Sequence, residues 1–475
     1  MILLVNPNLM KPPVTPVALD YLGQALEKAG FRVSLLDLAF EPDISAAIQS
    51  AVTGEEQLIA VTVRNTDDCY YASQDFCLDR TREIIRELKA LSFAPVIVGG
   101  VGYSVFPREA LDFLEADAGV VGEGEDALCR MAARVVSGEG LGGIPGVVLR
   151  EDRASEATVA PVLDLAGMDL SARPVVDNAR YLREGAMVGF ETKRGCDHHC
   201  IYCADPIAKG SRIRLRDPDN VAQEIRNLLR RGVDTFHTCD SEFNVPPDHG
   251  LEVCRSLIRL GLGDRIRWYA YATPLPFPEE LAEAMRRAGC VGIDFGVDHA
   301  DDEMLSRLGR RHRLEHLRET AARCRRHGLV TMYDLLLGGP GETRASLMRA
   351  FQALKSMEID RVGAAFGVRI YPGTSLARLV VQSGFRPDNP HLRGQIDGNE
   401  GFLRPVYYVS AELGEDIDSF VQEQIGGDER FFLGGTEPSD RNYNYNDNSF
   451  LIKAIRAGER GAFWDILRRS AGKPA

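Results

Sequence analysis

The sequence has no long hydrophobic run and no excess of basic charge. No stretch of its 475 residues reaches about 18 consecutive apolar positions, the length that a membrane-spanning helix needs. The N-terminus has no basic segment before its first apolar residues, so a signal peptide is not expected. The net charge of −13 disfavours general binding to the nucleic-acid backbone. We therefore expect a cytoplasmic protein that binds neither membrane nor nucleic acid.

The sequence also lacks the motifs of several common cofactors and staples. No G-x-G-x-x-G follows the first predicted strand, so a nicotinamide or flavin dinucleotide is not favoured. Of the ten cysteines only three are clustered, which argues against a disulfide framework. A chain of this length is too long for one compact core and predicts two or three domains.

Residues 1–150 alternate between short apolar runs and amphipathic segments. Such continuous apolar runs are typical of parallel strands covered on both faces. The pattern predicts an α/β, doubly wound (Rossmann-like) domain in which Thr15 caps the first helix. The predicted strands are Ile2–Val5, Phe31–Leu38, Leu58–Val63, Pro95–Val98 and Ala118–Val121, with an edge strand at Val147–Arg150.

Polar or glycine-rich turns follow four of these strands, at the edge where doubly wound sheets bind ligands. Glycines there let the backbone approach a ligand closely, although ordinary turn glycines are the alternative. The candidate ligand-binding residues are Pro12, Val14, Thr15, Arg64, Asn65, Gly99, Gly100, Tyr103, Gly122, Glu123 and Gly124.

The alternation restarts after a connector over residues 151–185. Six strand–helix units in series predict a partial (β/α)6 barrel over residues 186–385, with its chemistry at the carboxyl ends of the strands. Residues 386–475 predict a small, mostly helical region that packs over the barrel mouth and ends in a helix at Ser449–Arg468. The predicted barrel strands are Val188–Thr192, Thr235–Thr238, Arg267–Tyr271, Gly292–Gly296, Thr331–Leu336 and Gly363–Ile370.

Cys196, Cys200 and Cys203 form a C-x3-C-x2-C motif directly after the first predicted barrel strand. Three thiolates this close can bind one soft metal centre, and a four-iron cubane held by three of them keeps one iron open. Zinc is the alternative, because His198 or His199 could supply a fourth ligand, but no second C-x-x-C hook occurs. Position and spacing favour an iron–sulfur cluster.

The motif, with Tyr202 before its third cysteine, resembles that of the radical S-adenosylmethionine superfamily. The resemblance implies a 4Fe–4S cluster whose open iron binds S-adenosylmethionine and whose reduction of the sulfonium gives a 5′-deoxyadenosyl radical. It also implies cofactor contacts at the ends of later strands, including a Gly-x-Pro-Gly-Glu-Thr turn at residues 338–343. Cofactor contacts are assigned to Tyr202, Ser241, Glu242, Asp298 and Gly339, although Asp298-His299 stands where related enzymes often have Glu-Ser.

The N-terminal domain, with Gly99-Gly100 and Val-Gly-Glu-Gly-Glu at residues 121–125, resembles the cobalamin-binding domain of cobalamin-dependent radical enzymes. Many such domains ligate cobalt through the histidine of Asp-x-His-x-x-Gly, but no histidine precedes residue 198 here. The nearest likeness is the tryptophan 2-C-methyltransferase group, in which an arginine stands near cobalt. Arg64 is the candidate for that position, and an ion pair with Asp67 or Asp68 is its alternative role.

The resemblance implies a cobalamin-dependent radical S-adenosylmethionine methyltransferase. Such an enzyme moves a methyl group through methylcobalamin to a carbon of an amino acid, a peptide or a natural-product intermediate. In the tryptophan-methylating relatives the radical step is not used, so that step is open.

Two alternatives stay open at this stage. One is a radical enzyme that closes or rearranges a ring, and the other is a corrinoid or iron–sulfur sensor or electron carrier. We expect an electron donor such as flavodoxin or ferredoxin as a partner. The residues predicted to contact substrate or to move protons are Tyr333, Arg369, Tyr371, Tyr443 and Tyr445.

Overall fold

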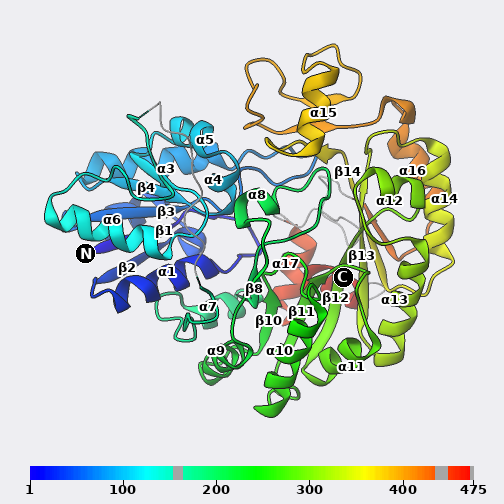
Figure 1. Ribbon diagram of the computed structural model, residues 1–475, viewed down its shortest axis with the longest axis horizontal. Helices are drawn as coiled ribbons and strands as arrows, with labels where there is room; N and C mark the ends of the chain where they lie inside the picture. The colour runs from blue at the N-terminus through cyan, green and yellow to red at the C-terminus, as the bar shows by residue number, and fades with distance from the viewer. Residues whose placement is uncertain (153–163, 434–447, 471–475) are drawn as a thin grey trace.

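The computed structural model describes residues 1–152, 164–433 and 448–470. Two large sheets lie next to each other, the N-terminal one at the left of Figure 1 and the second at the right. Helix α15 (Ser375–Ser383) lies above their junction in that view. Among the described helices, none is long and apolar enough to cross a membrane.

The N-terminal sheet has the strand order β2-β1-β3-β4-β5-β6, and all neighbours are parallel except β5 and β6. Its strands are β1 (Ile2–Asn6), β2 (Val33–Asp37), β3 (Leu58–Thr62), β4 (Val96–Gly99), β5 (Ala118–Val120) and β6 (Val147–Leu149). The helices are α1 (Val17–Lys28), α2 (Ile44–Ala51), α3 (Leu78–Leu91), α4 (Val101–Val105), α5 (Pro107–Leu114) and α6 (Glu125–Ser137), with a 3-10 turn, η1 (Leu38–Phe40).

Helices cover both faces of this sheet. One core joins it to α3 and α5 through residues such as Ile85 and Leu111. A second core joins it to α1 and α6 through Leu19 and Met131. Burial on both faces explains the continuous apolar strands and confirms the doubly wound fold. The strand order reverses between β1 and β3, where such sheets form a ligand crevice.

The second sheet is parallel throughout, in the order β18-β14-β13-β12-β11-β10-β7. Its strands are β7 (Val188–Phe190), β10 (Thr235–Thr238), β11 (Arg267–Ala272), β12 (Cys290–Asp298), β13 (Val330–Leu337), β14 (Arg361–Phe366) and β18 (Phe431–Leu433). The helices between them are α9 (Pro218–Arg230), α10 (Pro247–Arg259), α11 (Glu279–Arg287), α12 (Asp302–Arg307), α13 (Leu314–His327) and α14 (Arg344–Lys355). Six of these strands were predicted, and β18 was not.

Alternate residues of the barrel strands face two different cores. Ile293 and Phe295 of β12 pack outward against the helices. Tyr269 of β11 and Met332 of β13 face inward, where they pack against Trp464 of the C-terminal region. The C-terminal region therefore fills the end of the barrel lumen that lies away from the cysteine loop.

The C-terminal region departs from the predicted pattern in two further ways, besides the strand β18 that it adds to the barrel sheet. It contributes an antiparallel sheet, β15-β17-β16, in addition to helices. The predicted final helix is two helices, because Gly458 and Gly461 adopt positive φ values of 101° and 123° between them. The elements are β15 (Val368–Arg369), β16 (Leu392–Gly394), β17 (Val406–Tyr408), η2 (Ala411–Leu413), α16 (Ile417–Ile425), α17 (Ser449–Arg456) and α18 (Phe463–Ser470).

A buried ion cluster joins the two large sheets. Arg173, fully buried in the connector, donates to Asp20 of α1 at 2.7 Å and to Glu224 of α9 at 2.7 Å. Thr15 also spans the junction, because its hydroxyl donates to Met187 O and accepts from Gly189 N. The predicted capping role of Thr15 is therefore wrong, since its oxygen is bound to the strand β7 segment and α1 begins without a side-chain cap.

Candidate cofactor and substrate site

The three cysteines lie at the carboxyl end of the barrel, after β7 and the short strand β8 (Lys193–Arg194). Gly195 opens their loop with φ 90°, and a Cβ there would lie 2.2 Å from Arg212 O. Cys196 N donates to Gly210 O, and Ile201 N donates to Leu308 O, both at 3.1 Å. Backbone contacts on both sides therefore fix the loop that carries the thiols. The hairpin and helix around it are β9 (Arg214–Leu215) and α8 (Asp205–Lys209).

The cysteine thiols are largely desolvated. Burial raises the pKa of Cys196 to about 11 and also raises the pKa of Cys200 and of Cys203, and the three groups act on one another electrostatically. Binding to iron requires thiolates, so cluster assembly must displace three protons here. No three His, Cys, Asp or Glu side chains of the described residues surround a point that a single metal ion could occupy. A cubane differs in its demands, since each of its thiolates binds a separate iron atom.

Arg310 connects the cysteine loop to the strand ends around it. Its Nη1 lies 3.0 Å from Cys200 Sγ, and its Nε lies 3.4 Å from Asp298 Oδ2. Its Nη2 donates to Gly296 O and lies 3.7 Å from Glu242 Oε1. One guanidinium therefore contacts a thiol of the cysteine motif and two carboxylates in a single network.

Three of the residues predicted to bind S-adenosylmethionine belong to this network. Tyr202 donates to Asp298 Oδ2 at 2.5 Å, and Asp298 adopts φ 64°. Burial raises the pKa of Glu242 to about 7, although the Arg310 charge opposes this shift. Ser241 lies outside this network and donates to Asp205 Oδ2 at the start of α8. The network can hold a charged, hydrogen-bonding ligand beside the cysteines.

The turn after β13 is held from inside by a buried acid. Glu342 accepts from the backbone N–H groups of Gly338 and Gly339. Its other oxygen lies 2.9 Å from His299 Nε2, and both side chains are fully buried. The His299–Glu342 contact ties the ends of β12 and β13 together, which places Gly339 beside the barrel mouth.

A cavity separates the two sheets at the glycine-rich strand ends. It is lined by Gly99, Gly100, Gly122 and Gly124 on one side and by the β7–α8 segment and Ser241 on the other. Gly100 has φ 110°, and a Cβ there would lie 2.7 Å from Val63 O. This turn therefore requires glycine because of its positive φ and the close approach of Val63, and the turn lines the cavity.

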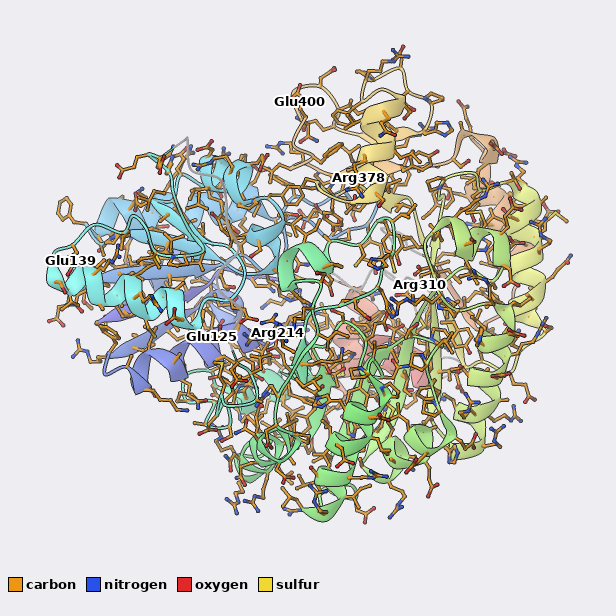
Figure 2. All side chains as sticks on the ribbon, in the orientation of Figure 1. Glu125, Glu139, Arg214, Arg310, Arg378 and Glu400 are labelled. Atoms are coloured by element: carbon orange, nitrogen blue, oxygen red, sulfur yellow. The ribbon has the colours of Figure 1, made fainter. Side chains whose placement is uncertain are left out.

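Ion pairs across the junction form the rim of this cavity. Arg194 pairs with Glu125 at 2.7 Å, and Arg214 pairs with Glu123. Figure 2 labels Glu125 and Arg214, which lie close together where the sheets meet. Glu123, predicted as a cofactor contact, is therefore held by the barrel hairpin.

A second hollow lies at the switch point between β1 and β3. Its lining includes Asn8, Arg64 and Asn65. Arg64 is exposed, and its guanidinium donates to Asn65 Oδ1 at 3.1 Å. The alternative of an ion pair between Arg64 and Asp67 or Asp68 is wrong. Asp67 binds Arg369 at 2.9 Å, and Asp68 accepts from Tyr70 N and from the Ser73 hydroxyl. Arg64 is thus available to a ligand at this edge.

The structure contradicts three of the sequence-based site assignments. Tyr333 is fully buried on the outer face of β13 and donates to Leu317 O at 2.6 Å, so it cannot contact substrate. Tyr103 is fully buried against Gly119 and does not line the cavity. Arg369 uses its guanidinium to hold Asp67 and three backbone carbonyls in a buried cluster.

The remaining predicted residues divide between two regions. Tyr371 lies beside Arg369, and its hydroxyl is 3.0 Å from Cys69 Sγ. Pro12 and Val14 lie half-buried in the β1–α1 loop. Tyr443 and Tyr445 lie outside the described residues.

Several polar residues of the barrel were not predicted as site residues. Arg310, Asp294 and Asp334 converge on the lumen and its mouth from separate strands and loops. The sequence gives little indication of Asp294 and Asp334 as site residues. Only the alternation of β12 and β13 places these two acids on the face opposite the apolar residues.

Comparison with known proteins agrees with this architecture. Residues 10–132 match the B12 binding domain, and residues 190–354 match the Radical SAM superfamily. The tryptophan 2-C-methyltransferase of Streptomyces laurentii is 30% identical over 97% of this chain and 94% of that protein.

Two solved structures of the methyltransferase TsrM from Kitasatospora setae share the whole fold. One, with tryptophan substrate and the S-adenosylmethionine analogue aza-SAM bound, is 30% identical, with a TM-score of 0.92 over 98% of this chain and 97% of that one. The other, with cobalamin and a [4Fe-4S] cluster bound, is 29% identical, with a TM-score of 0.90 over the same fractions.

The cysteine loop, the barrel and the glycine-lined cavity define a cobalamin-dependent radical S-adenosylmethionine enzyme. Within that class, the chain belongs to the methyltransferase family that includes the Streptomyces laurentii enzyme. It is a C-methyltransferase whose cofactors are a 4Fe–4S cluster, S-adenosylmethionine and cobalamin. The iron–sulfur prediction is confirmed, and neither rearrangement without methylation nor a sensor role has better support.

Proposed function

We propose that this enzyme methylates carbon 2 of the indole ring of tryptophan or of a closely related indole amino acid. The observation that carries the proposal is the similarity over the full length to a structure with tryptophan bound. That similarity includes the C-terminal region, where sequence patterns gave the least information. We further propose that residues 386–413 contribute to the substrate site at the carboxyl end of the barrel, where Ser410 N donates to Gly338 O. Helix α18 packs at the opposite end of the lumen, so the expectation that the whole C-terminal region covers the mouth is wrong for this helix.

The proposed reaction is redox-neutral overall. The methyl group leaves the sulfur of S-adenosylmethionine, which gives S-adenosylhomocysteine, and replaces the hydrogen of the indole carbon, which leaves as a proton. Cobalamin, when bound, carries the methyl group between the two substrates, and the cluster, when bound, anchors S-adenosylmethionine. Cys196, Cys200 and Cys203 would hold the cluster, and Glu242, Asp298 and Arg310 would fix the charged end of S-adenosylmethionine beside it.

We propose a separate role for Arg64 toward bound cobalamin. Near cobalt, its cationic side chain could not coordinate the metal and would disfavour a water ligand, which would favour reduction and methylation of the cofactor. Its exposed guanidinium at the β1–β3 switch point supports this assignment. We also propose an external one-electron donor of the flavodoxin or ferredoxin class, because the cluster and cobalt must be reduced before turnover.

The proposal is tested with anaerobically reconstituted protein, methyl-labelled S-adenosylmethionine, tryptophan and a chemical reductant. We expect labelled 2-methyltryptophan and an equal amount of S-adenosylhomocysteine, measured by mass spectrometry. Deoxyadenosine without methylated product indicates ring rearrangement instead. Neither product, with both cofactors bound, indicates a sensor or carrier. If the enzyme methylates another indole but not tryptophan, the proposed reaction holds and the proposed substrate is wrong.

A further inference from the structure

Two carboxyl groups face the barrel lumen from neighbouring strands. Asp294 lies between Ile293 and Phe295 of β12, which both belong to the outer core. Because successive strand residues point to opposite faces, the Asp294 side chain points inward. The same alternation directs Asp334 inward, since Tyr333 and Leu335 of β13 pack in the outer core. The two acids act on each other electrostatically.

No basic group of the described chain compensates Asp294. Its side chain is 4% exposed, and its Oδ1 has no hydrogen-bond partner among the described residues. Its pKa is raised well above the ordinary value by burial first and then by Asp334 and Glu242. A buried carboxyl with only acids as charged neighbours is costly for the fold unless a ligand supplies a cation.

An aromatic wall adjoins these acids on the same face of the sheet. Tyr271 of β11 is paired directly with Asp294 and is 45% exposed. The ring of His237 from β10 lies 4.5 Å from the Tyr271 ring. Burial lowers the pKa of His237 to about 4, so this ring is uncharged at neutral pH. An uncharged aromatic pair next to an acid pair suits a ligand that is both aromatic and cationic.

The acids also lie within reach of the cluster loop. Asp334 is paired with Gly296, whose carbonyl accepts from Arg310, and Arg310 contacts Cys200. Asp294 is two residues further from the mouth than Gly296, roughly 7 Å along the strand. A substrate bound at the acids would extend toward the site of S-adenosylmethionine and cobalamin.

We propose that Asp294 and Asp334 form the subsite that binds the ammonium group of the methyl acceptor, with His237 and Tyr271 against its aromatic ring. The inference rests on the proposed function in one respect, that the acceptor is an aromatic amine. The two acids determine which acceptor binds and take no direct part in the methyl transfer. S-Adenosylmethionine is the other cation near the barrel, and the experiment separates the two.

The test compares three ligands with the cofactor-loaded protein in equilibrium binding measurements. Tryptophan and tryptamine carry the ammonium group, and indole-3-propionate lacks it. We expect the wild-type protein to bind both amines more tightly than indole-3-propionate. Asp294→Asn and Asp334→Asn should each weaken amine binding about 10- to 100-fold while changing the affinity for indole-3-propionate less than about 3-fold. The exposed Asp418→Asn is the matched control and should change nothing.

Several results would overturn this subsite. The first is equal affinity of the wild-type protein for the amines and for indole-3-propionate. The second is that the two asparagine variants weaken the binding of all three ligands equally, and the third is that they weaken none. Loss of S-adenosylmethionine binding with unchanged tryptophan binding would assign the acids to S-adenosylmethionine. Asparagine keeps the shape of aspartate, and the wild-type ligand preference is a readout that needs no variant.

The outcomes also separate this inference from the proposed function. If the holoenzyme binds amines through both acids but makes no methylated tryptophan, the subsite is supported and tryptophan is not the substrate. If the Asp294→Asn variant methylates tryptophan and binds it as tightly as the wild-type protein does, the proposed function is supported and the subsite is wrong.

Discussion

Arg310 concentrates the electrostatics of the site in one side chain. It is 7% exposed and contacts Cys200, Asp298 and Glu242 at once. A positive charge beside a cluster ligand stabilises the reduced cluster, which carries one more negative charge. We therefore expect Arg310 to raise the reduction potential of the cluster in addition to ordering the loop.

Replacing this charge should lower the reduction potential of the cluster. We expect Arg310→Gln to shift the potential by on the order of 50–100 mV in the negative direction, because a charge a few ångströms away is lost from a partly buried site. A potentiometric titration followed by electron paramagnetic resonance measures the shift. Arg311→Gln, a change at a half-exposed neighbour that contacts Asp197, is the control and should leave the potential unchanged. An unaltered potential in the Arg310 variant would contradict this account.

Asp294 illustrates a residue whose function opposes stability. Burial raises the pKa of this carboxyl in the folded state. The stability that the protonated carboxyl contributes is therefore fully present only below its unfolded-state pKa of about 3.9. As the pH rises toward the folded-state pKa, the folded protein must retain a proton that the unfolded chain releases. Stability from this group is therefore lost on the alkaline side.

Asp294→Asn should stabilise the ligand-free protein at pH 8 and leave it unchanged near pH 4.5. The difference in unfolding free energy should grow by up to about 1.4 kcal/mol for each pH unit between the two pKa values. Thermal unfolding midpoints of both proteins at several pH values give this comparison. A pH-independent difference would show that the carboxyl is ionised in the fold or solvated in the lumen.

At the scale of elements, most strands could be predicted because burial on both faces makes them continuous apolar runs. Strand β10 begins and ends where the sequence predicted, at Thr235 and Thr238. The C-terminal helix pair could not be predicted, because its break depends on Gly461. A Cβ at this glycine would lie 2.4 Å from Tyr269 Oη, a contact that is made only after the barrel has formed.

The site shows the same division. The three cysteines and the glycine-rich turns are local sequence motifs, so their positions could be predicted. The acid pair of the lumen depends on the register of β12 against β13, which no local motif encodes. Tyr333 was assigned to the wrong face of its strand for the same reason, since a shift of one residue reverses every side chain.

The cysteine loop depends on a glycine whose surroundings leave no room for a side chain. We expect Gly195→Ala to reduce the iron and sulfide bound per chain severalfold, because its Cβ would lie 2.2 Å from Arg212 O. Gly232→Ala is the matched control, since Gly232 has a similar φ of 87° but no atom within 4 Å of the added Cβ. Both variants carry the same backbone strain of about 1 kcal/mol. Equal iron content in the two variants would show that the missing side chain of Gly195 is not needed for cluster binding.

At the scale of the whole molecule, the two sheets behave as one unit because charged groups are buried between them. Arg173 binds acids from both parts, and its side chain is fully buried with theirs. Removing one partner of such a cluster leaves uncompensated buried charge, whereas an exposed pair contributes little. The glycine-lined cavity that we assign to cobalamin lies at this same junction, so we expect the ion cluster to influence it.

Arg173→Met should lower the unfolding free energy by about 3–5 kcal/mol and loosen cobalamin retention during desalting. Arg183→Met is the control, because Arg183 is 66% exposed and its pair with Asp177 spans 3.8 Å. Differential scanning calorimetry and the visible spectrum after desalting measure the two effects. A variant with the thermal midpoint and cobalamin content of the control would contradict the joining role.

The central claim is that one methyl group passes from S-adenosylmethionine to the acceptor through cobalamin held at this junction. The most direct test loads the reconstituted protein with cobalamin that carries a trideuterated methyl group, and then adds unlabelled S-adenosylmethionine and tryptophan. We predict that the first equivalent of 2-methyltryptophan carries the deuterium label and that later equivalents do not. Unlabelled product from the first turnover, with the label still on cobalt, would contradict this account.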